Sequence, residues 1–294
     1  LFEEINHDLG LAFCYAWQPS PRYGFVKTAW LQNRGETACA VTILDGLQNL
    51  LPYGANSGLQ NTFSNLLDAY KRAELEPSAG LAIFSLSATL TDQAEPSESL
   101  RATTVWQTGL SDTRYLLSSA QLDKFRRGQP ICEERDVRGR RGAFFACATL
   151  ELAAGAQREW SIVAEINQDS AAVIGLLGEL QAEPAELAAR LRRDAEQGSA
   201  DLMRLVASAD GLQHTGDQLS SARQLANVLF NIMRGGVFAD GYAIDTADLR
   251  EFLAARNRPL LRKQRALLES LPARIELSEL RAHAAASGSR DLER

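Results

Sequence analysis

The amino-acid composition of the 294-residue chain changes near residue 166, and this change constrains the fold more than any other feature. Residues 1–166 contain 17 of the 21 aromatic residues, all four tryptophans and all four cysteines. The rest of the chain is rich in Leu, Ala, Arg and Glu, which favour helices. We therefore predict an antiparallel β-sandwich with one inserted helix over residues 1–166, followed by a helical linker region over residues 167–294.

Seven segments of the first part are rich in β-branched and aromatic residues, and several alternate at period two, which is typical of strands. These segments are 10–17, 24–31, 37–44, 81–90, 100–107, 143–152 and 158–165. Between them, residues 59–73 have helical spacing and predict a helix lying on the core. Its apolar face would consist of Leu59, Phe63, Leu66, Leu67 and Tyr70. Residues 109–142 look like a long irregular connection.

The second part predicts a succession of helices. They cover residues 169–180, 184–207, 217–233, 245–255, 260–270 and 277–286. The glycine pair Gly235 and Gly236 should end the third helix, and Asp245 or Thr246 should cap the fourth by accepting backbone N–H groups. The predicted fold class is therefore α+β, a large antiparallel sandwich followed by helices.

Charge and motif content exclude several functions. A net charge of -6 argues against nucleic-acid binding, and charged residues interrupt every apolar run, so we expect no membrane span. Cys14, Cys39, Cys132 and Cys147 lie singly in apolar surroundings without paired zinc spacing, which predicts buried free thiols and a cytoplasmic location. No phosphate-binding glycine motif, nucleophile elbow or metal-ligand cluster is present. We expect no cofactor, no metal and no catalytic residue within this chain.

The segment after residue 44 combines hydrogen-bonding groups with apolar and aromatic surface, as sugar recognition requires. Asp45 ends an apolar strand and opens a predicted loop that reaches residue 54, in which Gln48, Asn49 and Tyr53 are the other candidate contacts. A plainer interpretation is a turn in which Asp45 accepts backbone N–H groups while nearby leucines pack inward. Both interpretations stay open on the sequence.

Two stretches of the first part carry a family resemblance. Residues 15–33 (YAWQPSPRYGFVKTAWLQN) and 43–54 (ILDGLQNLLPYG) resemble the N-terminal β-sandwich of proteins related to cellobiose phosphorylase. Residues 223–236 (RQLANVLFNIMRGG) and 242–248 (YAIDTAD) are similar to the helical connector of the same proteins. The resemblance implies a supersandwich of the galactose-mutarotase-like kind, a helical linker and a separate (α/α)6 barrel.

In the phosphorolytic relatives the catalytic acid and the phosphate site belong to that barrel, and no acid of this chain matches the family's acid. The resemblance thus implies a non-catalytic N-terminal fragment of a phosphorylase or a glycoside hydrolase, inactive alone, whose substrate is an oligosaccharide. It implies packing against the missing barrel, a share in shaping the substrate cleft, and a homodimer in some relatives. Asn231 and Arg234, in the turn that ends at residue 236, join the residue 45–54 loop as candidate barrel-facing contacts.

Alternatives come from other classes of protein. A self-standing lectin-like module would use Trp17, Tyr23, Trp30 or Trp106 as stacking platforms, although core packing is the more common fate of strand aromatics. A structural or assembly module would instead use the helices as an interface. A complete hydrolase within the chain is a more distant alternative.

Overall fold

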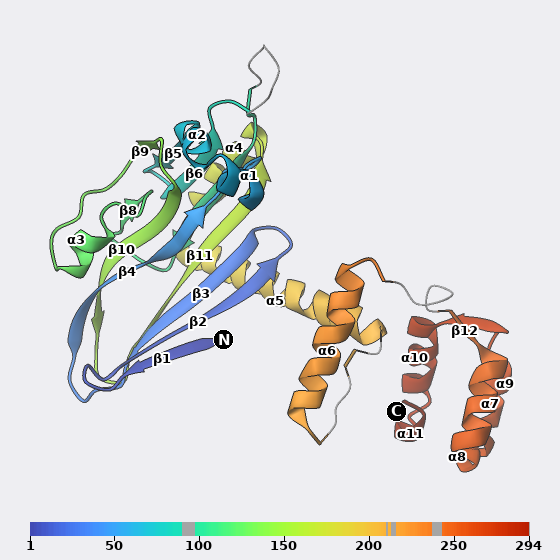
Figure 1. Cartoon of the computed structure of the whole chain (residues 1–294). Helices are drawn as coiled ribbons and strands as arrows, with labels where there is room; N and C mark the ends of the chain where they lie inside the picture. The colour runs from blue at the N-terminus through green and yellow to red at the C-terminus, as the bar shows by residue number, and fades with distance from the viewer. Residues whose placement is uncertain (90–97, 210, 213–215, 237–242, 294) are drawn as a thin grey trace. The chain divides into compact units, whose positions relative to one another are not determined.

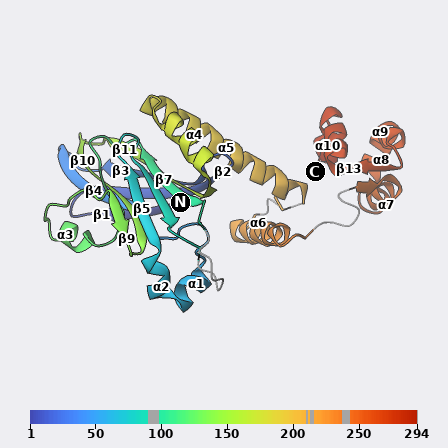
Figure 2. The same cartoon turned by 90° about the horizontal axis from the view of Figure 1, so that it is seen from above.

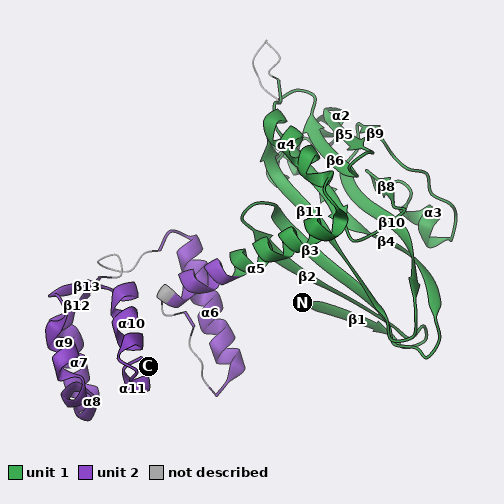
Figure 3. Cartoon of the chain, turned by 180° about the vertical axis from the view of Figure 1, so that it is seen from behind, with its two compact units in different colours: residues 1–199 green, residues 200–294 purple. Residues whose placement is uncertain are grey.

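The computed structural model describes residues 1–89, 98–209, 211–212, 216–236 and 243–293 (Figure 1). The chain divides into two compact units, Leu1–Ser199 and Ala200–Arg294 (Figure 3). The last strand of the first unit ends at Gln168, close to the boundary predicted at residue 166. The predicted boundary is the point at which strands give way to helices. The division between the two compact units lies further on, within the long helix Pro184–Ser208.

The first unit contains two antiparallel sheets. The larger sheet has eight strands, in the spatial order β1 (Phe2–Asn6), β2 (Leu11–Ser20), β3 (Gly24–Asn33), β11 (Gln157–Gln168), β7 (Ala102–Thr108), β6 (Leu81–Leu86), β5 (Lys71–Glu76) and β9 (Asp136–Arg138). The smaller sheet has three strands, in the order β4 (Cys39–Leu50), β10 (Gly142–Leu152) and β8 (Arg114–Leu116). Together with the helices, these sheets confirm the predicted α+β fold with an antiparallel sandwich.

The main core lies between the two sheets, because alternate residues of each strand point toward the opposite sheet. From the larger sheet, Ala29, Phe84 and Ile162 are fully buried, and from the smaller sheet Phe144 and Ala146 meet them. The period-two alternation that predicted the strands therefore also divides each strand into an inward and an outward face.

Two helices cover the outward face of the larger sheet (Figure 2). They are α4 (Ser170–Leu180) and the first part of α5 (Pro184–Ser208). Leu187 and Leu191 of α5 are buried against Val26 and Trp106 of the sheet. A second apolar cluster thus fixes these helices to the sandwich.

The helix predicted over residues 59–73 is interrupted and ends early. The structure has two short helices, α1 (Ser57–Thr62) and α2 (Ser64–Ala69), separated at Phe63, whose ψ of 36° interrupts the helical backbone. Strand β5 then begins at Lys71 and buries alternate residues. Of the predicted apolar face, Leu67 is fully buried, whereas Phe63 and Leu66 are half exposed.

Other differences concern short or exposed elements. Residues 109–142 are not wholly irregular, because they contain β8, β9 and α3 (Leu122–Arg126). Strand β1 was not predicted, and its five residues are all exposed. The strand predicted over residues 81–90 ends at Leu86, and Leu90 lies outside the described residues. All four cysteines are free thiols as predicted, but the expected burial holds for Cys14 and Cys147 alone, because Cys39 is partly exposed and Cys132 is exposed.

The second unit is mostly helical, as predicted. Its elements after α5 are α6 (Gln218–Met233), β12 (Ala243–Asp245), α7 (Thr246–Arg256), α8 (Arg258–Lys263), α9 (Arg265–Ser270), β13 (Arg274–Glu276), α10 (Leu277–Ala286) and α11 (Arg290–Glu293). Asp245 caps α7 by accepting the Ala247 N–H at 2.8 Å, which confirms one of the two predicted caps. The short paired strands β12 and β13 were not predicted. Among the described residues, no helix has the length and apolarity needed to cross a membrane.

Candidate functional site

An open groove with a volume of about 720 Å³ lies between inward-facing residues of the two sheets. Strands β2, β3, β7 and β11 of the larger sheet form one wall, and β4 with the segment after it forms the other. We call this surface the groove. It is lined by Tyr15, Trp17, Phe25, Lys27, Gly46, Leu47, Gln48, Asn49, Leu50, Leu51, Thr103, Ala164 and Ile166.

The groove lies where burial falls toward one end of the sandwich. Along the inward face of β3, the exposed fraction rises from 0% at Ala29 to 7% at Lys27 and 56% at Phe25. On the neighbouring strands, Trp17 is 46% exposed and Ile166 is 53% exposed. Residues that continue the apolar core pattern therefore become the walls of an open surface, which places large aromatic side chains in contact with solvent.

Strand β4 carries the predicted residues, but not in the predicted loop. The strand continues without a break from Cys39 to Leu50, so the expectation that a loop begins at Asp45 is wrong. Gly46 makes the continuation possible, because a β-carbon at this position would lie 1.9 Å from the Phe144 carbonyl oxygen of β10. The close approach of the two strands lets the ladder run past Asp45.

A β-bulge in β4 presents Gln48 and Asn49 at the rim of the groove. Leu47 pairs with Phe144 and Leu50 pairs with Gly142, so three steps along β4 match two steps along β10. Asn49 has a φ of 55°, a left-handed conformation that asparagine adopts more readily than most residues. Both amide side chains are exposed and line the groove.

Asp45 lies behind this rim and joins the two sheets. Its Oδ1 atom forms an ion pair with the Lys27 ammonium of β3, and its Oδ2 atom accepts the Trp160 Nε1–H at 2.8 Å. The interpretation in which Asp45 accepts backbone N–H groups of a turn is therefore wrong. The Lys27 Nζ atom also lies 5.2 Å from the centre of the Tyr15 ring, within the range of a cation–π interaction.

The structure brings together only part of the predicted set. Gln48 and Asn49 line the groove, and Asp45 lies behind them without lining it. Tyr53 follows β4, is 41% exposed and does not line the groove either. Asn231 and Arg234 belong to the other unit, at the end of α6. There, the Asn231 side chain donates to the Asn227 carbonyl oxygen at 2.9 Å, and the Arg234 guanidinium lies over a phenylalanine ring of the same helix.

Sequence reasoning missed Phe25, Lys27 and Tyr15 as groove residues. A signal was present in the alternation of β3, where Lys27 is the single charged residue of the inward face and lies between Phe25 and Ala29. Trp17 was considered only as a lectin-like platform. Among the other tryptophan and tyrosine candidates of that alternative, Trp106 and Tyr23 are buried, so they offer no stacking face.

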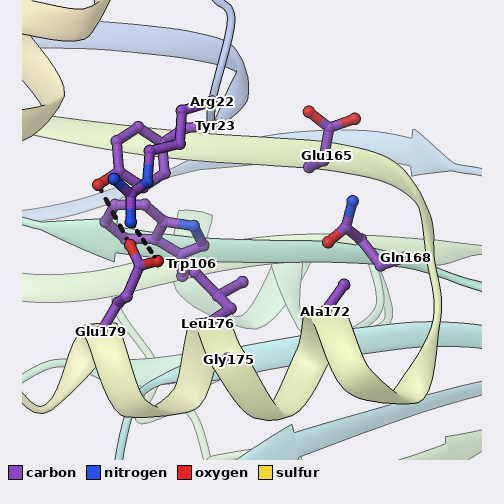
Figure 4. Close-up of a pocket in the computed structure, with 9 residues that line it drawn as sticks. All are labelled: Arg22, Tyr23, Trp106, Glu165, Gln168, Ala172, Gly175, Leu176 and Glu179. Atoms are coloured by element: carbon purple, nitrogen blue, oxygen red, sulfur yellow. Dashed lines mark hydrogen bonds and ion pairs between the residues drawn. The ribbon is translucent and has the colours of Figure 1, made fainter.

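A second pocket, of about 240 Å³, lies between α4 and the larger sheet; we call it the α4 pocket (Figure 4). Glu179 accepts hydrogen bonds from Arg22 Nη2 at 2.5 Å and from the Tyr23 hydroxyl at 3.2 Å. Burial, reinforced by the negative charge of Glu179, raises the pKa of Tyr23. Because Glu179 of α4 pairs with Arg22 and Tyr23, these contacts hold α4 against the larger sheet.

The side chains that line the groove are aromatic, amide, aliphatic and hydroxyl groups with one ammonium group. Hydrolysis of a glycosidic bond needs two carboxyl groups on either side of it, and none of the described residues lining the groove is acidic. Within the described ranges, no group of three His, Cys, Asp or Glu side chains is placed to hold a metal ion. Aromatic faces, amide groups and one ammonium instead offer non-covalent contacts to a polar ligand.

Comparison with protein families finds a match for one part of the chain. Residues 238–294 match the family model for Glycoside hydrolase family 149 insertion domain 1. We call them the insertion-like segment; its described part runs from β12 to α11 within the second unit. The match supports a glycoside hydrolase or phosphorylase-family domain. A search of curated proteins found no match.

Proposed function

We propose that this chain is a non-catalytic accessory part of a glycoside hydrolase or phosphorylase, and that the groove binds a segment of the oligosaccharide substrate. The observation that carries the proposal is the groove itself, in which the exposed rings of Trp17 and Phe25 accompany the amides of Gln48 and Asn49. The insertion-like segment supports the enzyme class independently, because it lies in the other unit.

The chemistry of the groove suits a sugar. The flat, weakly polar face of a pyranose ring packs on an aromatic ring, whereas its equatorial hydroxyl groups need donors and acceptors at the edge. Each side-chain amide offers two N–H donors and one carbonyl oxygen, which matches the dual character of a hydroxyl group. Because the groove is open, it accommodates a chain that passes through rather than a single enclosed ring.

The reaction itself is assigned to another part of the parent enzyme. The resemblance to proteins related to cellobiose phosphorylase supports an (α/α)6 barrel as that part, with the sandwich shaping the substrate cleft and contributing to a dimer. Phosphate or water would then accept the glycosyl group, according to the parent. The free thiols of the chain support a cytoplasmic location.

Binding of oligosaccharides to the whole chain tests this proposal. Titration calorimetry with neutral gluco-oligosaccharides of several linkages should show binding by the wild type, and Trp17→Ala should weaken it at least about tenfold, or 1.4 kcal/mol. Tyr53→Ala is the matched control, since Tyr53 is similarly exposed but lies outside the groove lining. Equal affinity of the wild type and Trp17→Ala would refute the groove as the site. Dimerisation without any sugar affinity would favour the assembly alternative.

A further inference from the structure

Lys27 of β3 and Asp45 of β4 are charged residues on the inward faces of the two sheets, among apolar neighbours. On β3, the inward-facing neighbours of Lys27 are Phe25 and Ala29, and on β4 the corresponding neighbours of Asp45 are Ile43 and Leu47. Each strand therefore contributes one charged side chain to the space between the sheets, and the two form an ion pair across it. A charged pair in this position needs a reason, because removing both charges from water is costly.

The two members of the pair differ in what they leave available. Both oxygens of Asp45 are occupied, one by Lys27 and one by the Trp160 indole. An ammonium group has three N–H donors, and Asp45 is the one described residue that accepts a hydrogen bond from Lys27. The aromatic rings beside Lys27 stabilise its charge but do not satisfy the remaining donors. Its side chain is 8% exposed, and Lys27 is one of the residues that line the groove.

We infer that the Lys27 ammonium donates hydrogen bonds to the sugar in the groove, and that Asp45, as a positioning residue, holds Lys27 there and cancels its charge so that the groove prefers uncharged to acidic oligosaccharides. This inference rests on the proposed function and names the substrate class of the same site. Sugar hydroxyl and ring oxygens supply the acceptors that the spare donors lack.

The preference follows from charge balance. Lys27 is the one charged residue among the described residues that line the groove, and Asp45 already compensates it. A carboxylate on an acidic sugar would lose hydration in the groove without gaining an unpaired cation. Replacing Asp45 by an uncharged residue of the same shape would leave the ammonium uncompensated, and the groove would then attract carboxylates.

Three variants separate these contributions. Lys27→Met keeps an unbranched stem but removes the donors. Asp45→Asn keeps a carbonyl oxygen that can accept from Lys27 or Trp160 but removes the charge. The double variant Lys27→Met with Asp45→Asn leaves no unpaired buried charge, so it tests the loss of the donors if Lys27→Met alone does not fold. Thermal unfolding of each variant establishes that it is folded before binding is measured.

The probes are neutral gluco-oligosaccharides and the same oligosaccharides oxidised to carboxylates at C6, measured by calorimetry at two salt concentrations. We expect the wild type to bind the neutral form more tightly, and the double variant to lose at least about tenfold in affinity for it. Asp45→Asn should shift the ratio of the two affinities at least about tenfold toward the oxidised form, with the gain weakened by salt. A purely structural ion pair between the sheets would not change this ratio.

The failures are distinguishable. If the wild type binds neutral oligosaccharides and Trp17→Ala abolishes binding, but the double variant binds normally and Asp45→Asn leaves the ratio unchanged, the inference about Lys27 and Asp45 is overturned and the proposed function stands. If the wild type binds neither form, both fall together.

Discussion

The groove and the α4 pocket are lined by similar kinds of side chain but differ in whether those side chains are already satisfied. In the α4 pocket, Trp106 and Tyr23 are buried, and Glu179 is occupied by two donors from the same pocket. In the groove, Trp17 is about half exposed, and the amide of Gln48 forms no hydrogen bond with another described residue. The contacts in the α4 pocket stabilise the fold, whereas the groove leaves an aromatic ring and an amide group available to a ligand.

Residue type alone therefore does not identify a binding site. Aromatic and polar residues occur together at both places, and the α4 pocket has more charged groups. Since unpaired polar groups and exposed aromatic faces gain most from a partner, the groove is the stronger candidate despite its simpler composition. Mutations at the two places should therefore affect different properties, stability at the α4 pocket and sugar affinity at the groove.

Trp106 is the position at which a substitution should cost the most stability. Replacing it by alanine removes a buried indole against which α4 and α5 pack, and should lower the free energy of unfolding by about 3–5 kcal/mol in urea denaturation. Trp17→Ala, at an exposed ring, should cost no more than about 1 kcal/mol. The folded fraction of Trp106→Ala should bind sugar as the wild type does. Comparable losses of stability in Trp106→Ala and Trp17→Ala would contradict the different roles given to the α4 pocket and the groove.

Gly46→Ala should affect both stability and binding. Its new β-carbon would collide with the Phe144 carbonyl oxygen, so β4 must move away from β10, at a cost of about 1–3 kcal/mol. Because the bulge that carries Gln48 and Asn49 follows directly, sugar affinity should fall as well. Gly216→Ala is the control for a glycine substitution in open space, because nothing lies within 4 Å of the added β-carbon and the backbone there is not left-handed. Unchanged binding in a destabilised Gly46→Ala variant would show that the rim tolerates the shift.

The sandwich was predictable from sequence because alternation of side chains is a local property. Strands such as β2 and β3 follow the period-two pattern closely, and the cap at Asp245 likewise needs only its neighbours in sequence. The error at residues 59–73 is also local in origin. Apolar residues at helical spacing before residue 71 predict that the helix continues. Instead, Lys71, Ala73 and Leu75 are buried alternately in a strand that pairs with β6.

The candidate site was only partly predictable, since it depends on how two sheets face each other. Gln48 and Asn49 were found from their composition, but the loop assigned to them is a bulged strand. The partnership of Lys27 with Asp45 cannot be read from either strand alone, because it requires knowledge of which inward faces meet. The loss of burial toward one end of the sandwich, which turns an inward position such as Phe25 into a groove wall, has no local signal.

Tyr23→Phe should give a smaller change, confined to the α4 pocket. The substitution removes the hydroxyl that donates to Glu179 at 3.2 Å and keeps the ring packed edge-on against Trp106. The free energy of unfolding should fall by about 0.5–1.5 kcal/mol, with sugar affinity unchanged. Tyr53→Phe, at an exposed ring, provides the control and should be close to neutral. A change in sugar affinity on Tyr23→Phe would show that the two places are coupled.

The smallest expected effect is on the dependence of stability on pH. Burial raises the pKa of Tyr23 in the folded chain, so the folded state keeps this proton at a pH at which the unfolded chain, with a tyrosine pKa of about 10, releases it. The resulting stabilisation is fully present below the unfolded pKa and is lost as the pH rises through the folded pKa. In strongly alkaline solution, the free energy of unfolding of Tyr23→Phe should therefore fall less steeply with rising pH than that of the wild type.

Tyrosinate absorbance measured against pH supplies an independent readout of the same group. The wild type should retain a late-titrating tyrosine that is missing in Tyr23→Phe, while Tyr115, whose pKa burial also raises, titrates late in both proteins. Saturation with oligosaccharide should leave this late titration unchanged, because Tyr23 faces α4 and does not line the groove. A shift of the Tyr23 titration on sugar binding would place the ligand at the α4 pocket and reverse the roles assigned to the two surfaces.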